Sequence, residues 1–211
     1  MKPQRIILVR HGESQGNAEP ENYASIPDYA LKLTDKGNEQ AVDAGRKIAE
    51  IIHDGYFRAY VSPWHRSRET YAGIASVLKE RIVRSLEDPR IREQDWGHLQ
   101  TVENLERINQ ERNNYSPFYY RLPDGESGAD VYDRVSTFLE PLHRDFEKSD
   151  FPENALIVTH GMTLRIFLMR WFHWSVEFFE SIRNPSNGEV FVMERGDDNR
   201  YHLVTDLRLR K

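Results

Sequence analysis

The sequence contains no cysteine among its 211 residues. This absence excludes disulfide bonds, thiolate nucleophiles and cysteine-ligated metal ions, and it fits a protein of a reducing compartment. The sequence also lacks an apolar run of the roughly 20 residues that a membrane-spanning helix needs. Residues 1–5 are too few and too polar to form a secretory signal ahead of the first apolar run. We therefore expect a cytoplasmic, intracellular protein.

Basic residues do not predominate. The formal net charge is −5 at pH 7, whereas proteins that bind nucleic acid usually carry a basic balance or a basic stripe. Apolar residues make up 38% and charged residues 30% of the chain, which argues against an intrinsically disordered protein. We therefore expect a small molecule as the partner, and neither a nucleic acid nor a membrane.

Two short apolar runs are each followed directly by a histidine and a glycine. Residues 6–9 precede Arg10-His11-Gly12, and residues 155–159 precede His160-Gly161. Continuous aliphatic runs of this length are typical of strands buried on both faces of a parallel sheet. The carboxyl ends of such strands form the ligand site in open α/β sheets. One arginine and two histidines at this edge suit an anionic group, and phosphate is the first candidate.

Expected strands and helices alternate along the chain. We expect helices at residues 34–52, 101–113, 131–146 and 163–172, and another helix that begins at Ser62-Pro63. We expect further strands at residues 57–61, 190–193 and 201–205, and one that begins at residue 82. This alternation predicts one domain over residues 1–211, a three-layer α/β/α fold with a mostly parallel central sheet. The least regular segment, approximately 98–128, is interpreted as a small cap insertion over the carboxyl ends of the strands.

Five motifs stand in a fixed order across most of the chain. They are Arg10-His11-Gly12-Glu13-Ser14 with Asn17, Ser62-Pro63 with Arg66, Arg92-Glu93 with Trp96-Gly97, Asp124-Gly125-Glu126-Ser127, and Thr159-His160-Gly161. A single Arg-His-Gly would be a weak signal, but the ordered set closely resembles the histidine phosphatase (phosphoglycerate mutase-like) superfamily. The resemblance implies an α/β enzyme that transfers phosphoryl groups.

The resemblance also implies roles for individual residues. His11 would attack phosphorus and form a phosphohistidine, which a neutral imidazole can do near neutral pH. Glu93 would protonate the leaving oxygen and then activate the hydrolytic water. The phosphoryl oxygens would be bound by Arg10, Asn17, Arg66, Gly161 and His160, the last expected to be protonated. No metal ion or other cofactor is implied, because these groups supply the positive charge.

The sequence departs from cofactor-dependent phosphoglycerate mutases in two places. Residues 22–27 replace a Phe-Thr-Gly-Trp-type stretch, and the cap stretch 113–121 lacks the arginine pair that holds the substrate carboxylate in those enzymes. A mutase must retain a bisphosphorylated intermediate, which requires such cationic anchors. We therefore expect a phosphatase that acts on small phosphomonoesters with broad specificity, similar to the broad-range acid phosphatases among plant and fungal members.

Two alternatives stay open. A phosphoglycerate mutase or a sugar bisphosphatase would require Arg107, Arg112 or Arg121 to face the site. A non-catalytic module that binds a phosphorylated ligand is the weaker alternative, because such a module would be expected to lose His11 or Glu93, and both are present.

Aromatic residues cluster in the irregular segment, and the sequence favours neither of two roles for them. Tyr115, Phe118, Tyr119 and Tyr120 either form an apolar lid that selects the leaving group or pack the cap onto the main domain. The sequence leaves the oligomeric state open too. Edge strands near the carboxyl terminus could pair between subunits, so a homodimer is one candidate.

Overall fold

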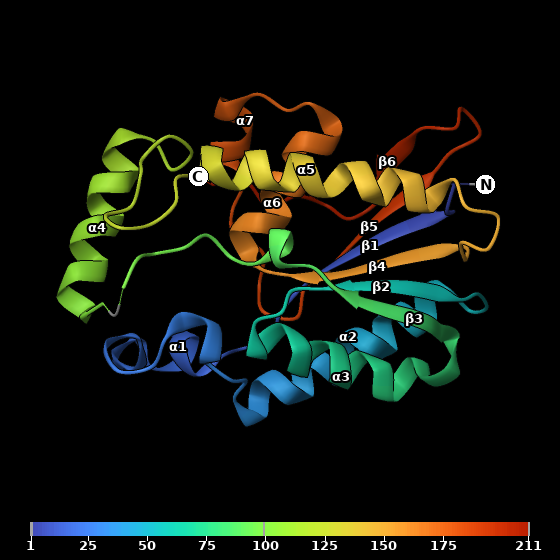
Figure 1. The fold of residues 1–211 in the computed structure, drawn as a ribbon, viewed down its shortest axis with the longest axis horizontal. Coiled ribbons are helices and arrows are strands. Elements are labelled where there is room, and N and C mark those ends of the chain that lie inside the picture. Colours follow the sequence, from blue (N-terminus) through green and yellow to red (C-terminus); the bar gives the residue numbers. More distant parts are fainter. Residues whose placement is uncertain (1, 99, 211) are drawn as a thin grey trace.

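A six-stranded sheet lies between two layers of helices in the computed structural model, which describes residues 2–98 and 100–210 (Figure 1). The strands are β1 (Arg5–Arg10), β2 (Phe57–Val61), β3 (Ile82–Glu87), β4 (Asn154–Thr159), β5 (Val190–Arg195) and β6 (Tyr201–Leu203), in the spatial order β3-β2-β4-β1-β5-β6. Strands β1 to β4 are mutually parallel, and β5 is antiparallel to both β1 and β6. The predicted α/β fold with a mostly parallel sheet is confirmed.

Helices cover both faces of the sheet. The helices are α1 (Gln15–Ala18), α2 (Asp35–Ile51), α3 (His65–Leu78), α4 (Val102–Tyr115), α5 (Gly128–Phe146), α6 (Gly161–Phe172) and α7 (Val176–Ser181). In Figure 1, α2 and α3 lie on one face and α5 and α6 on the other. In the part of the chain that the structure describes, no helix combines the length and the apolar character needed to cross a membrane.

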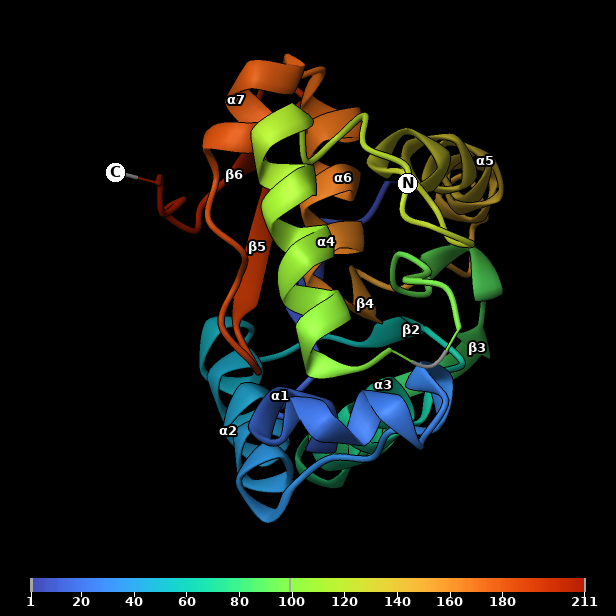
Figure 2. The same cartoon turned by 90° about the vertical axis from the view of Figure 1, so that its left-hand side faces the viewer.

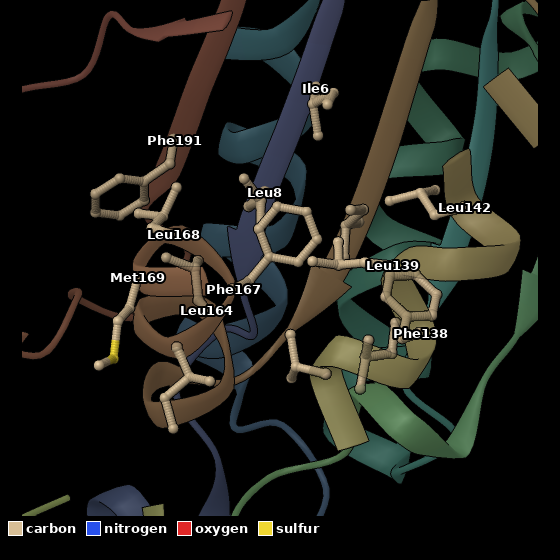
Figure 3. Close-up of a cluster of buried hydrophobic side chains, with 14 of the residues drawn as sticks. Ile6, Leu8, Phe138, Leu139, Leu142, Leu164, Phe167, Leu168, Met169 and Phe191 are labelled. Atoms are coloured by element: carbon tan, nitrogen blue, oxygen red, sulfur yellow. The ribbon is translucent and has the colours of Figure 1, made fainter. Parts of the chain in front are cut away.

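Side chains of β1 alternate between two hydrophobic clusters. Ile6 and Leu8 join the cluster under α5 and α6 (Figure 3), whereas Ile7 and Val9 join the cluster under α2 and α3. All four are fully buried, and burial of a side chain of this size stabilises the fold by about 1.5–3 kcal/mol. Strand β4, which pairs with β1 from Arg5 to Arg10, is buried along its whole length. The two buried strands therefore bring their histidines to one edge of the sheet.

The segment expected to form a cap contains α4. This helix lies in front of the carboxyl ends of β1 and β4, and its lower end in Figure 2 is near α1. It begins after Thr101, whose side chain caps the amide of Asn104. The residues that follow the parallel strands therefore lie beneath α4 and the loop that leads into it.

Several helix boundaries follow from capping. The predicted start of α2 is confirmed, because the Thr34 hydroxyl accepts a hydrogen bond from the Gly37 amide at 3.1 Å. The expected start of α3 at Ser62-Pro63 is wrong, since α3 begins at His65. Ser62 stays extended because its amide donates to the Val158 carbonyl of β4 at 3.0 Å. Tertiary pairing with the sheet thus delays the helix by two residues.

Two glycines let α2 approach the loop that carries His11. A Cβ on Gly12 would lie 2.3 Å from the Gly37 carbonyl oxygen, and a Cβ on Gly37 would lie 2.1 Å from the Glu13 carbonyl oxygen. Neither position can hold a side chain without displacing backbone. The Gly12 amide also donates to the hydroxyl of Thr70 on α3 at 3.0 Å. The loop is therefore held from both helices.

Candidate active site

His11 is buried at the carboxyl end of β1, with 3% of its surface exposed. Its Nδ1 lies 2.7 Å from the Gly12 carbonyl oxygen, which can only accept a hydrogen bond, so Nδ1 carries the proton. Burial, followed by the charges of Arg66 and Arg10, lowers the pKa of His11 well below its ordinary value. The ring is therefore neutral, and its Nε2 lone pair faces the site.

Two arginines lie beside that lone pair. Arg66, near the start of α3, is 3% exposed, and its Nε donates to Nε2 of His11 at 3.2 Å. Arg10 directly precedes His11, and one of its amino groups donates to the Pro185 carbonyl. Its Nε is buried and makes no hydrogen bond to the described residues. Two guanidinium groups around a neutral imidazole make a site for a tetrahedral oxyanion.

His160 follows β4, and its ring centre is 5.1 Å from that of His11. Its Nε2 lies 2.7 Å from the Ser62 hydroxyl and 3.2 Å from the Ser67 hydroxyl. Burial lowers the pKa of His160 well below its ordinary value, with neighbouring Arg66 next in effect. This shift favours a neutral His160 in the free protein, whereas the sequence analysis expected a protonated ring at a bound phosphoryl group. Its buried Nδ1 makes no hydrogen bond to the described residues and is free to meet a ligand.

Glu93 reaches the same site from the loop after β3. Its carboxylate oxygens accept from the amides of Met162 and Thr163, each at 3.3 Å, at the N-terminus of α6. The Thr163 hydroxyl donates to the Arg92 carbonyl at 2.6 Å and holds the backbone next to Glu93. The positive end of α6 and these amides thus fix a carboxylate beside His160, which is the N-cap of α6.

Arg134 on α5 holds the loop of Glu93 from behind. Its guanidinium donates to the carbonyls of Arg90, Arg92 and Glu93 at 2.7, 2.9 and 3.1 Å, and to both carboxylate oxygens of Glu126 at 3.0 Å. Sequence reasoning did not select Arg134. The only clue in the sequence was that Arg134 follows Glu126 of the fourth motif by eight residues. A lone arginine on a helix is usually a surface residue, so this clue was weak.

Asn17 and Gly161 also lie at this edge of the sheet. Asn17 is exposed and forms a capping box with Ser14, and its Oδ1 also accepts from Asn187 at 2.9 Å. Both bonds use Oδ1, so the amide nitrogen stays free for a ligand oxygen. Gly161 is the first residue of α6, where a Cβ would lie 2.4 Å from Oδ1 of Asn184. The phosphate-binding roles of both residues stay predictions.

Residues 184–188 form part of the wall of the site, and the sequence reasoning missed them. The Pro185 carbonyl accepts from Arg10, and the Gly188 amide donates to the His11 carbonyl at 3.1 Å. The sequence signal was only a turn-rich stretch, Asn-Pro-Ser-Asn-Gly, which is common in loops. Among the described residues, no group of three or more His, Cys, Asp or Glu side chains is arranged to hold a metal ion.

The cap presents one cation to the site. Arg112 lies over the ring of Trp96, 5.5 Å from its centre, and an amino group lies 3.7 Å from Sδ of Met162. It makes no ion pair within the described residues. Arg107 and Arg121 instead pair at the surface with Glu111 and Asp130. Of the three candidate anchors, Arg112 therefore faces the site.

The cap aromatics divide into buried and exposed residues. Phe118 packs against Phe179 and Tyr132, with ring centres 5.7 and 6.1 Å away. Tyr115 and Tyr119 are 73% and 57% exposed. Phe118 therefore supports the packing interpretation, whereas the lid role of Tyr115, Tyr119 and the half-buried Tyr120 stays a prediction.

A family model described as "Histidine phosphatase superfamily (branch 1)" matches residues 6–206. A phosphoglycerate mutase-like protein of Arabidopsis thaliana is 44% identical over 96% of this chain and 68% of its own length. A broad-range acid phosphatase of Saccharomyces cerevisiae is 30% identical over 98% of this chain and 90% of its own length.

Solved structures share the fold at low sequence identity. The YhfR protein of Bacillus stearothermophilus superposes with a TM-score of 0.75 at 22% identity, covering 96% of each chain. A mycobacterial glucosyl-3-phosphoglycerate phosphatase superposes with a TM-score of 0.72 at 19% identity, covering 96% of this chain and 98% of its own. These likenesses support the arrangement of sheet and helices described above.

We predict that Arg134→Gln destabilises the protein by about 3–5 kcal/mol, because it removes the donors to three loop carbonyls and one of the two guanidinium partners of Glu126, which keeps only the partly exposed Arg92. The side chains of Arg134 and Glu126 are 11% and 15% exposed. Arg121→Gln is the matched control, since it breaks a pair with Asp130 that is 64% and 33% exposed, and it should cost about 1 kcal/mol or less. Urea unfolding measures both, and equal midpoints would contradict the structural role of Arg134.

We also predict that acid destabilises the protein through its two buried imidazoles. The folded-state pKa of each lies below the unfolded value of about 6.5, so the unfolded state gains protons first as pH falls. Below that pH each imidazole should remove about 1.4 kcal/mol of unfolding free energy per pH unit. Urea unfolding between pH 7 and pH 5 should show a smaller slope for His160→Gln, whereas replacement of the exposed His53 by Gln should keep the wild-type slope. An unchanged slope in His160→Gln would disprove this explanation.

Proposed function

The chain belongs to the histidine phosphatase superfamily, and from this premise we propose that it hydrolyses phosphomonoesters through a phosphohistidine on His11 without a metal ion. The observation that carries the proposal is the neutral His11, whose Nδ1–H is held by a carbonyl and whose Nε2 lies beside Arg66. A neutral imidazole with a directed lone pair needs no further base to act as a nucleophile. The non-catalytic alternative gains no support, because the nucleophile is in place.

In the first step, Nε2 of His11 attacks phosphorus while the bond from phosphorus to the leaving oxygen breaks. Arg10 and Arg66 bind the equatorial oxygens, whose negative charge needs preorganised donors. If the Ser62 hydroxyl donates to Nε2 of His160, the free Nδ1–H of His160 donates to another oxygen. His160 then binds phosphate as a neutral donor.

Glu93 supplies the proton that the leaving oxygen requires. A bound phosphate beside Glu93 repels negative charge and so favours its protonated form in the complex. In the second step the resulting carboxylate accepts a proton from water as the water oxygen attacks phosphorus. The bond from phosphorus to Nε2 breaks, inorganic phosphate is released, and both side chains return to their starting forms. Such proton transfer contributes typically 100- to 10,000-fold in rate.

Broad specificity is supported by the cap and by one relative. Tyr115 and Tyr119 of the cap are exposed and Phe118 is packed into the core, so these three residues offer few contacts that would select one alcohol. The yeast relative is named a broad-range acid phosphatase. We therefore assign hydrolysis of small phosphomonoesters as the main activity.

We predict that the protein hydrolyses p-nitrophenyl phosphate in EDTA and that His11→Ala lowers the rate by at least about 1,000-fold. A ³²P-labelled substrate should yield an acid-labile phosphoenzyme in the wild type that is absent from the variant. Replacement of the exposed His202 by Ala is the matched control and should keep full activity. A folded wild type with neither turnover nor phosphoenzyme would refute the proposal, and activity that requires a divalent metal would refute its metal independence.

A second candidate activity follows from Arg112. Its guanidinium lies next to Met162, whose amide binds Glu93, so its charge is on the leaving-group side of the phosphate. Burial lowers the pKa of Arg112, with Glu93 the nearest compensating charge. A substrate with a second anionic group, such as a phosphoglycerate or a sugar bisphosphate, would pair with it. This observation keeps mutase or bisphosphatase chemistry as the alternative.

We predict that Arg112→Gln raises KM for 3-phosphoglycerate by about 10-fold, the loss expected for one charge-assisted hydrogen bond. KM for p-nitrophenyl phosphate, which has no second anion, should change by less than about twofold. Arg107→Gln, on the same helix but paired with Glu111 at the surface, should alter neither value. Equal changes for both substrates would show that Arg112 does not select anionic leaving groups.

A further inference from the structure

Asp28 lies against the phosphate site although it belongs to none of the five motifs. It begins a short 3₁₀ turn, Asp28–Ala30, in the long loop between β1 and α2. Its Oδ1 accepts from Nη1 of Arg66 at 2.8 Å, and its carbonyl oxygen accepts from the same nitrogen at 2.6 Å. The side chains of Arg66 and Asp28 are 3% and 22% exposed. Asp28 thus holds one edge of a buried guanidinium with two acceptors.

The other edge of that guanidinium meets the nucleophile. Nε of Arg66 donates to Nε2 of His11 at 3.2 Å, and the ring of Trp64 lies under the guanidinium with its centre 4.6 Å away. Contacts on two edges and one face leave the group little freedom to rotate. A continuous line of hydrogen bonds therefore runs from the Asp28 carboxylate through Arg66 to the attacking nitrogen.

A carboxylate at this place opposes the binding of an anion. Burial raises the pKa of Asp28, and the nearby charges of Glu93 and Asp95 raise it further, against the lowering effect of Arg66. The same carboxylate would repel the phosphate that Arg66 is there to bind. Replacing it with a neutral residue should thus strengthen phosphate binding, unless its contact with Arg66 serves a later stage of the reaction.

We propose that Asp28 is a positioning residue for phosphoryl transfer. It holds Arg66 so that the Nε–H group can exchange its acceptor, from Nε2 of His11 to a phosphate oxygen, without rotation of the guanidinium. In the free protein this N–H occupies the lone pair that must attack. When phosphate enters, one of its oxygens replaces Nε2 as the acceptor and frees the lone pair, while Nη1 stays on Asp28. Fixed donors of this kind stabilise the transition state without reorganisation. The inference rests on the proposed function of His11.

The test is Asp28→Asn, which keeps an oxygen acceptor and the size of the side chain but removes the charge. We expect kcat for p-nitrophenyl phosphate to fall about 10- to 100-fold, the range for a hydrogen bond between charged groups. We expect the inhibition constant of inorganic phosphate to stay unchanged or to fall, because the opposing charge is gone. A general loss of structure would instead weaken phosphate binding together with turnover.

Asp43→Asn is the matched control, since Asp43 pairs with Arg46 at the surface, where the side chains are 57% and 66% exposed. Its kcat and its phosphate inhibition should equal those of the wild type. The double variant Asp28→Asn/Arg66→Ala should be no slower than Arg66→Ala alone, because Asp28 acts through Arg66. Thermal unfolding of each variant verifies that it is folded under the assay conditions.

The outcomes separate the positioning role from the proposed function. An inactive wild type would refute the proposed function, and the role of Asp28 with it. An active wild type with equal kcat in Asp28→Asn and Asp43→Asn would refute the positioning role alone. So would a lower kcat accompanied by weaker phosphate inhibition, or additive losses in the double variant.

Discussion

The hydrogen bond between Nδ1 of His11 and the Gly12 carbonyl fixes which nitrogen of the imidazole faces the phosphate site. Because the proton is on Nδ1, the lone pair is on Nε2, where Nε of Arg66 donates to it and the charge of Arg10 also acts on the ring. Burial and these two positive charges lower the pKa of His11, so the ring stays neutral and its lone pair remains available for attack. The loop geometry, the paired glycines and the Thr70 contact all serve to hold this one carbonyl and this one ring.

The acid–base side of the site is built on a different principle. Glu93 is on an irregular loop, and its position depends on α6 in front and on Arg134 behind. Arg134 donates to three carbonyls of the loop and to Glu126. A single side chain on α5 therefore replaces the regular backbone hydrogen bonds that the loop lacks. The proposed nucleophile, His11, is therefore positioned by a strand, whereas the proposed general acid, Glu93, is positioned by the hydrogen bonds of α6 and Arg134.

Two charged side chains at the edge of the site, Arg112 and Asp28, bear on which substrates it would bind. Arg112, which makes no ion pair with the residues that the structure describes, brings a positive charge from the cap, and Asp28 brings a negative charge from the loop after β1. In the proposed reaction, the phosphoryl group would lie among fixed donors, while the leaving group would meet the cation of Arg112 on a separate helix. This arrangement is consistent with a family whose members are named both as phosphatases and as mutase-like proteins.

The sequence by itself determined the sheet, its two histidine-bearing strands and the order of the motifs, because buried strands and capped helices are encoded by local runs such as residues 6–9 and by Thr34. It also placed His11 and His160 at one edge, since parallel strands end together, whereas Arg66 and Glu93 were assigned to the site through the resemblance of their motifs to the family. Tertiary structure alone decided the neutral state of His160, the start of α3, the exposure of Tyr115 and the contacts of Arg134, Arg112 and Asp28. Each of these depends on burial or on partners supplied by other elements of the fold, and neither is contained in a local pattern of residues.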